Sequence, residues 1–470
     1  MSPLGPAAEA GRPPLVATRV VAARAVALLC LALVAFNCAV NILPEQPIFW
    51  IVTPTRLTVL IGIVAALATG ESRWRTDLDI PLATLLLCAA VANHLAGQQW
   101  ATWRGLVTVI AIYYLAVAVS RVIPDPWPAI VLLAIVCVSI AAGVAVQQVV
   151  EGTPTGFCRG ALDGSDDVCG AGAMIRATGT FSNPNLLAAF LVLLLPVAAA
   201  GVAVTVDVSA RLLGGGLIVM GYVAVFLSGS RAGVIAAVAG LVVHAGFHRL
   251  KSGRALTVNR VYSALGIGLA VVMAVALFVL ATRGKVGVRA DVWVAGVRIA
   301  GEHPLGVGPG RSGAHLNEQT TGSETYQHAH NLWLNYAIEA GVVGMCAVVA
   351  ITVIGIWSAF DASRANSPTA PATAAGLAGF VVMNLVDSPA SNHRIAFATA
   401  IVLAVLIVGR ERPRPTPPPE LRTASMFDVT MPLPRSAAFT PPVAPKRRLP
   451  TFRSRNRTTP ATNPPSPVRC

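Results

Sequence analysis

Two histidines, His328 and His330, stand where a polar segment runs into an apolar stretch that begins at Leu332. Imidazole is the side chain best suited to accept a proton near neutral pH, which makes His330 the predicted general base. A histidine that only caps a helix is the plainer interpretation of His330 taken by itself. The following Asn331 and the later Gly341-Val342-Val343-Gly344 favour catalysis, because such glycines let another helix backbone approach closely and fix the histidine-bearing helix.

The role of His328 depends on the backbone between the two histidines. If a helix has already begun there, the two side chains point to different faces, whereas on an extended lead-in they share one face. His328 is predicted to assist in substrate binding, and a simple loop role is the equal alternative.

Three arginines form the second chemical signal. Arg231 lies in the tight turn Ser228-Gly229-Ser230-Arg231 between two apolar stretches, Arg176 precedes the run Ala177–Asn185, and Arg289 begins a short helical pattern. Any one of them alone is typical of a residue that extends its charge to the membrane interface. Three arginines on the face predicted for His330 favour an anion site instead, since a guanidinium matches a phosphate oxygen pair and stays charged.

Composition shows what must position these residues. The 470 residues are 55% hydrophobic and only 12% charged, about half the charge of a soluble domain, with a mean hydropathy of +0.67. Apolar runs long enough to cross a bilayer recur along the chain, which predicts an all-α polytopic membrane protein with about twelve spans. The predicted spans are 20–41, 49–68, 80–97, 104–122, 128–150, 185–206, 212–228, 232–248, 259–281, 331–357, 372–388 and 394–409.

The charge distribution gives the predicted orientation and domains. The net charge of +14 does not indicate nucleic acid, because 12 of the 35 Lys/Arg lie from Arg410 onward and others lie in short alternate loops, as in cytoplasmic loops of membrane proteins. We expect a cytoplasmic N-terminus over 1–19, a membrane domain over 20–409 and a disordered Pro/Arg-rich cytoplasmic tail over 410–470. Both termini are then cytoplasmic.

Two long outer loops are predicted, over 151–184 and 282–330. The first contains Cys158 and Cys169, which form either a disulfide or two free thiols. The second is expected to carry a short helix over 288–301.

Acidic residues were weighed for metal binding or proton handling. Asp163, Asp166 and Asp167 are more typical of a solvated turn than of a metal site, so no metal is predicted. Asn384 and Asp387 lie near the outer end of a span, where an aspartate either pairs with an arginine, handles protons or makes a structural contact.

Four sequence runs in order resemble the O-antigen ligase-like membrane family. They are Asn183-Pro184-Asn185, Ser228–Arg231, Pro304–Gly310 and His330-Asn331 with Gly341-x-x-Gly344. The resemblance implies a glycosyltransferase with a GT-C type membrane fold, which acts on glycans linked to polyprenyl diphosphate at the outer face of the bacterial cytoplasmic membrane. It implies His330, Arg231 and Arg289 as catalytic residues, and the substrate-binding residues are Arg176, Asn331, His328 and Asn185. The Arg/Pro-rich tail is not part of the family pattern.

The chemistry that follows needs neither a metal nor another cofactor. Arginines stabilise the diphosphate as it leaves, and a histidine removes the proton of the acceptor hydroxyl, so the anomeric centre is inverted. The predicted function is transfer of a glycan from undecaprenyl diphosphate to an acceptor glycolipid or cell-envelope polymer. An alternative that stays open is a polymerase that joins polysaccharide repeat units on the same carrier. A lipid-linked glycan flippase is the alternative from another class, and the gathering of charges at one face together with no visible inverted repeat disfavours it.

Overall fold

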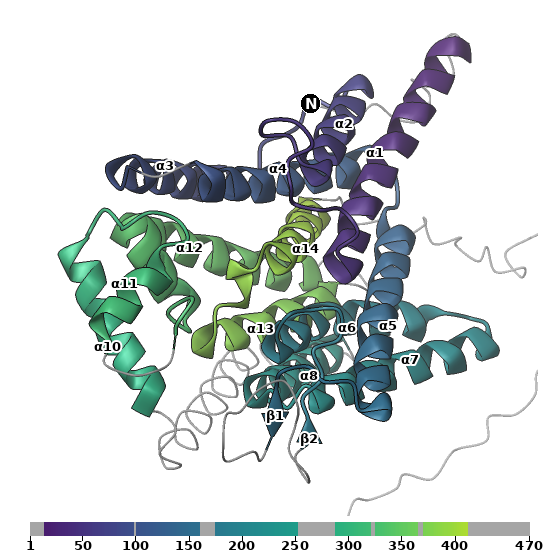
Figure 1. The fold of residues 1–470 in the computed structure, drawn as a ribbon. Helices are drawn as coiled ribbons and strands as arrows, with labels where there is room; N and C mark the ends of the chain where they lie inside the picture. The colour runs from purple at the N-terminus through teal and green to yellow at the C-terminus, as the bar shows by residue number, and fades with distance from the viewer. Residues whose placement is uncertain are drawn as a thin grey trace, which may run out of the picture. The chain divides into compact units, whose positions relative to one another are not determined.

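A computed structural model describes residues 14–97, 100–159, 174–251, 287–320, 325–364 and 370–411. These residues form helices and one short antiparallel pair of strands (Figure 1). The helices are α1 (Pro14–Val40), α2 (Pro54–Ala68), α3 (Asp79–Leu95), α4 (Ala101–Val122), α5 (Trp127–Glu151), α6 (Pro184–Val204), α7 (Val208–Leu227), α8 (Arg231–Lys251), α10 (Gly287–Glu302), α11 (Ser312–Gln319), α12 (Leu332–Arg364), α13 (Ala370–Val386), η2 (Pro389–Ser391) and α14 (His393–Glu411); the strands are β1 (Cys158–Arg159) and β2 (Met174–Ile175).

The helices coincide with the predicted membrane spans. Among the described residues, seven helices are long and apolar enough to cross a membrane, in α1, α4, α5, α6, α7, α12 and α14, and four shorter apolar helices lie in α2, α3, α8 and α13. Together they cover eleven of the expected spans, while 259–281 and most of the tail lie outside the described residues. The chain is therefore a multi-pass helical membrane protein, and the full count of twelve stays a prediction.

The local sequence explains where the helices α6 and α12 begin. The Asn183 side chain accepts a hydrogen bond from the backbone N–H of Asn185, and Pro184 occupies the first helical position of α6. Asn331 does the same for α12, where its Oδ1 accepts the N–H of Leu334 at 3.0 Å. Each side chain satisfies a donor that a helix start leaves unpaired, and proline there loses no hydrogen bond.

The helices α12, α13 and α14 pack between α3 and α4 on one side and α6 and α8 on the other. In Figure 1, α12 and α14 lie against α3 and α4, while α13 lies against α6 and α8. Small residues allow the close approach of α13, since Gly379 faces the backbone carbonyl of Ala236 on α8 and Gly240 of α8 faces that of Ala375. Such contacts are typical of helix packing in membranes, where backbones approach through glycine and alanine.

Charged contacts mark one end of this bundle. Arg121, at the end of α4, donates a 2.6 Å hydrogen bond to Glu411 at the end of α14. Arg410 pairs with Asp77 at 2.7 Å and with Asp361 at 3.1 Å. The carboxyl ends of α4, α12 and α14 thus share one face, so their amino ends lie on the opposite face, where the histidines precede α12.

Both long loops contain ordered elements. The helix α10 matches the helix expected over 288–301, whereas α11 was not predicted. In the first loop β1 pairs antiparallel with β2, with Cys158 opposite Ile175. Cys158 is disulfide-bonded, which favours the disulfide over the free thiol, and Cys169 lies outside the described residues.

The expectation for the two glycines that follow the histidines needs a correction. Gly341 does not admit another helix: it interrupts α12 with φ 76° and ψ 178°, and a methyl group on it would overlap the carbonyl oxygen of Pro304. Gly344 does face a helix, since an added Cβ would lie 3.5 Å from Cβ of Cys88 on α3. The two glycines therefore allow the close approach of the loop at Pro304 and of the helix α3.

Gly341→Ala is expected to lower the unfolding temperature of the detergent-purified protein. A positive φ with this ψ is essentially restricted to glycine, costs about 1–3 kcal/mol for other residues, and the clash with Pro304 adds to that cost. Gly143→Ala on α5 is the matched control, because an added methyl there meets no atom within 4 Å. Equal unfolding temperatures for the two variants would contradict the proposed constraint.

Candidate functional site

His328 and His330 converge on one carboxylate. Nε2 of His328 lies 3.0 Å from Oδ1 of Asp387, and Nδ1 of His330 lies 3.2 Å from the same oxygen. The centroids of the two imidazole rings are 4.8 Å apart. Because α12 begins only at Leu332, the histidines lie on a non-helical lead-in and share one face, as the second of the two sequence-based alternatives expected.

The backbone of this lead-in is strained and held in place. His330 has φ 49°, a left-handed conformation that few residues other than glycine adopt. The neighbouring N–H of Ala329 donates to Oδ1 of Asn335 at 3.1 Å, and Nδ2 of Asn331 donates to the carbonyl of Leu385 at 3.0 Å. Asn331 also caps α12, so its two polar atoms are engaged with backbone, which favours a positioning role over the predicted contact with substrate.

Asp387 is the centre of the cluster. It follows α13, is 5% exposed, and its Oδ2 accepts a 2.8 Å hydrogen bond from Nδ2 of Asn185. Its Oδ1 also accepts the backbone N–H of Ser388 at 2.8 Å. In the described contacts the partners of Asp387 are two histidines, Asn185 and a backbone N–H. The pairing with an arginine is not observed there, whereas proton handling and a structural contact between helices both stay open.

The carboxylate determines which nitrogen of His330 is available. An ionised carboxylate only accepts hydrogen bonds, so its contact with Nδ1 of His330 places the proton on that nitrogen. The Nε2 atom then keeps its lone pair and can accept a proton, while Asp387 stabilises the imidazolium that forms. This arrangement is that of an oriented general base.

The predicted arginines fall into two places. Nε of Arg176 donates to the carbonyl of Ser228 at 3.0 Å and passes over Gly229, where an added Cβ would lie 3.1 Å from it. Arg231, two residues farther, begins α8 with an exposed side chain. Arg176 and Arg231 therefore flank one turn, and the segment that starts at Arg176 ends at Asn185, which contacts Asp387.

Arg289 belongs to a different element. It lies on α10, three residues before the buried Val292, and its side chain is half-buried. In the part of the chain that the structure describes, no hydrogen bond or ion pair connects Arg289 to the histidines or to the turn at Ser228, so its predicted catalytic role stays a prediction.

Glu339 is a site-forming residue that the sequence analysis did not select. It lies in α12 and accepts a 2.7 Å hydrogen bond from Oγ of Ser312, while its backbone carbonyl accepts the N–H of Gly308 at 3.1 Å. The Gly-rich run from Pro304 is thereby fixed to the helix that follows the histidines. The sequence signal that could have identified Glu339 is an acidic residue inside an otherwise apolar span.

Arg394 is a second residue near the site that the sequence analysis did not select. Its buried guanidinium donates to the carbonyls of Cys38 at 2.9 Å, Ala39 at 2.6 Å and Thr180 at 2.7 Å, and lies 4.1 Å from the ring centroid of Phe181. These contacts join the end of α1 and the segment before Asn185 to the start of α14. An arginine at the start of an apolar span was again the signal.

An apolar cavity of about 130 Å³ adjoins the cluster. It begins one residue past Asn331, at Leu332, and continues along Trp333 and Tyr336 on α12 to Asn384, one turn before Asp387. Side chains of α3, α4 and α14 complete its lining. The cavity therefore offers an apolar group a place along the part of α12 that follows the histidines.

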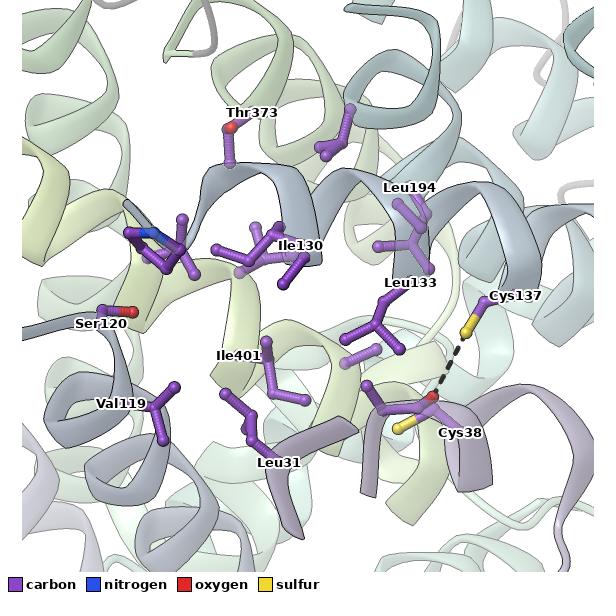
Figure 2. A pocket seen from close by; sticks show the side chains of 18 of the residues that line it. Leu31, Cys38, Val119, Ser120, Ile130, Leu133, Cys137, Leu194, Thr373 and Ile401 are labelled. Carbon is purple, nitrogen blue, oxygen red and sulfur yellow. Dashed lines mark hydrogen bonds between the residues drawn. The ribbon is translucent and has the colours of Figure 1, made fainter. Parts of the chain in front are cut away.

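Another apolar cavity, of about 60 Å³, contains none of the predicted site residues. Figure 2 shows Leu31, Ile130, Leu133 and Ile401 lining it, and a hydrogen bond from Cys137 to the carbonyl of Ala35. Its described lining is almost wholly apolar, so we interpret this cavity as packing space rather than as a site for chemistry.

The family comparison covers the histidine side of the site. A family model described as O-antigen ligase matches residues 215–349, from α7 to the middle of α12. Arg231, Arg289 and both histidines lie within the match, and Asp387 lies outside it. A search of curated proteins found no match.

Proposed function

We propose that this chain, whose residues 215–349 match a family model described as O-antigen ligase, transfers a glycan from a polyprenyl diphosphate, such as undecaprenyl diphosphate, to an acceptor glycolipid or cell-envelope polymer. The observation that carries the proposal is the pairing of His330 with Asp387 at the start of a membrane helix. The proposal places the site at the outer face of the bacterial cytoplasmic membrane, with both termini inside and twelve spans in a GT-C type fold.

In the proposed reaction His330 acts as the base. Its Nε2 removes the proton of the acceptor hydroxyl, whose oxygen attacks the anomeric carbon as the bond from that carbon to the diphosphate oxygen breaks. Attack from the side opposite the diphosphate inverts the anomeric centre. Asp387 stabilises the imidazolium, which returns its proton to water, and such a base contributes typically ~10²–10⁴-fold.

Arginine charges stabilise the leaving diphosphate. Arg231 is exposed and free of a carboxylate partner in the described contacts, and Arg176 flanks the same turn, so both present positive charge on the site face. Fixed charges of this kind are often the largest contribution to catalysis, and they remove the need for a metal ion in the transfer step. Arg289 is the third arginine of the proposal.

The apolar cavity beside the histidines suits the carrier lipid. A polyprenyl chain is a hydrocarbon, and the lining from Leu332 to Tyr336 offers it apolar contacts next to the reacting centre. The carrier needs charged groups for its diphosphate at the membrane surface and apolar groups for its chain within the helix bundle. The arginines and the apolar cavity provide the two.

Purified protein with a polyprenyl-diphosphate-linked oligosaccharide provides the test. With EDTA present, we expect release of polyprenyl diphosphate only when an acceptor glycolipid or polymer is added. Ladder products from the donor alone would replace the ligase by a repeat-unit polymerase. Intact donor that crosses a liposome bilayer without release would overturn the transferase and support a flippase.

Arg231→Lys is expected to lower transfer by roughly 10- to 100-fold. Lysine keeps the charge but loses the planar pair of donors, and hydrogen bonds to charged groups contribute about 1.5–3 kcal/mol. Initial rates of polyprenyl diphosphate release provide the measurement. Arg211→Lys is the control and should leave the rate unchanged, because Arg211 is exposed and its described hydrogen bonds go to the backbone carbonyl of Thr205. Full activity of Arg231→Lys would reduce Arg231 to an interface residue.

A further inference from the structure

The cluster at Asp387 also has the composition of a transition-metal site. Nε2 of His328, Nδ1 of His330 and a carboxylate oxygen of Asp387 all lie within 4.8 Å of one another. Two imidazoles with one carboxylate and an open fourth position are a common ligand set for Zn²⁺ and for other late first-row divalent ions. We propose that these three side chains bind such an ion, and that the bound ion switches off the transfer proposed above.

The ligand atoms must move closer together before they hold one ion. At a tetrahedral ion, Zn–N bonds of about 2.1 Å hold two nitrogens about 3.4 Å apart, against up to 4.8 Å between the ligand atoms here. Both imidazoles are 26% exposed, so each ring is free to turn on its partly open side toward the ion. The same exposure gives an ion a route from the aqueous face and leaves the fourth position to water.

The carboxylate is already oriented for binding. Its Oδ2 is held by Nδ2 of Asn185 at 2.8 Å, which leaves Oδ1 directed at the two histidines. Groups that fix a ligand in this way tune metal affinity by about 10–100-fold. The site therefore has three ligands and an outer partner for one of them.

Binding of an ion at this position would remove the base. The ion takes the lone pair of Nδ1 of His330, so the proton on Nδ1 moves through solvent exchange to Nε2. In His328 the proton moves from Nε2 to Nδ1, and neither ring gains or loses a proton overall. With a proton on Nε2, His330 has no lone pair left for the acceptor hydroxyl, and transfer stops. This last step rests on the proposed role of His330, whereas binding of the ion does not.

Co²⁺ absorption in the visible range tests the site directly. The full-length protein in detergent, with an affinity tag that lacks histidine, should bind Co²⁺ saturably at one equivalent and release it to Zn²⁺. His328→Ala and Asp387→Asn should each weaken binding by at least about 100-fold, more than loss of an outer partner costs. His315→Ala is the control, because His315 is not a member of this cluster and pairs with Glu318 at 3.7 Å, so binding should be unchanged.

Two results would overturn the metal site: no saturable absorption in the wild type, or wild-type affinity in both cluster variants. Transfer assays test the switch separately, and we expect Zn²⁺ to stop polyprenyl diphosphate release and EDTA to restore it. Transfer that continues with the site saturated, or that requires Zn²⁺, would overturn the inhibitory role. A protein that binds Co²⁺ yet never transfers a glycan would refute the proposed function and leave the metal site standing.

Discussion

His330→Ala is expected to lower glycan transfer by roughly 10²–10⁴-fold while the protein still inserts into the membrane. The reason is local: Nδ1 of His330 contacts Asp387 at 3.2 Å, and Nε2 is then the lone pair that accepts the hydroxyl proton. Folding should survive, because α12 begins after this residue and is capped by Asn331.

Initial rates of acceptor-dependent polyprenyl diphosphate release would measure the loss. His328→Ala is the informative comparison, since His328 has the same exposure and the same carboxylate partner, yet we expect a smaller fall because it only assists. Imidazole in the buffer should restore part of the rate to His330→Ala, by entering the vacated space as a base. Near-normal transfer by His330→Ala would rule out the proposed base.

Membrane spans and helix starts were predictable because both are local properties. Apolar runs define the spans, and Asn183-Pro184 gives both a cap and a suitable first residue for α6. The short helix α10 followed from its own pattern in the same way. Eleven of the predicted spans therefore correspond to helices of the described residues, with boundaries that differ by a few residues.

The partners of site residues were not predictable because they lie far apart in the sequence. Asp387 is 57 residues from His330 and 202 from Asn185, and no local pattern specifies that the three meet. The aspartate was noticed as a costly residue in an apolar segment, but its partner was unspecified. Arg394, which bonds carbonyls 214 and 356 residues away, illustrates the same limit.

The glycine pair shows a different limit. Glycine in a membrane helix indicates that something approaches closely, yet the kind of neighbour depends on tertiary packing. Gly344 meets α3 as expected, whereas Gly341 receives the loop at Pro304. That loop is hydrogen-bonded to Glu339, so the Gly-rich run and α12 form one unit, which only the tertiary contacts reveal.

Asp387→Asn is expected to lower the maximal rate of transfer by at least about 10-fold, and by up to ~10⁴-fold, the loss that the same substitution causes in Ser-His-Asp triads. The carboxylate of Asp387 accepts four hydrogen bonds, from His328, His330, Asn185 and the backbone of Ser388. An amide has one oxygen with two lone pairs and brings two donors of its own, so it cannot satisfy four donors.

Two consequences follow from that mismatch. If the introduced NH₂ faces the histidines, it donates to Nδ1 of His330, the ring proton moves to Nε2 and the base is lost. If it faces Asn185, whose amide turns to accept, the tautomer survives but the negative charge that stabilises the imidazolium is gone. Either orientation slows the chemical step without removing a group that contacts the donor, so the maximal rate should fall while the apparent KM for the donor stays near that of the wild type.

A matched substitution separates this effect from a general loss of charge. Asp361→Asn makes the same change in an aspartate that pairs with Arg410 at the opposite face, and it should leave transfer unchanged. In the double variant Asn185→Asp/Asp387→Asn the introduced carboxylate accepts the introduced NH₂, which turns the amide oxygen back toward the histidines, so part of the lost rate should return. A single Asp387→Asn variant with the wild-type rate would show that Asp387 does not orient His330.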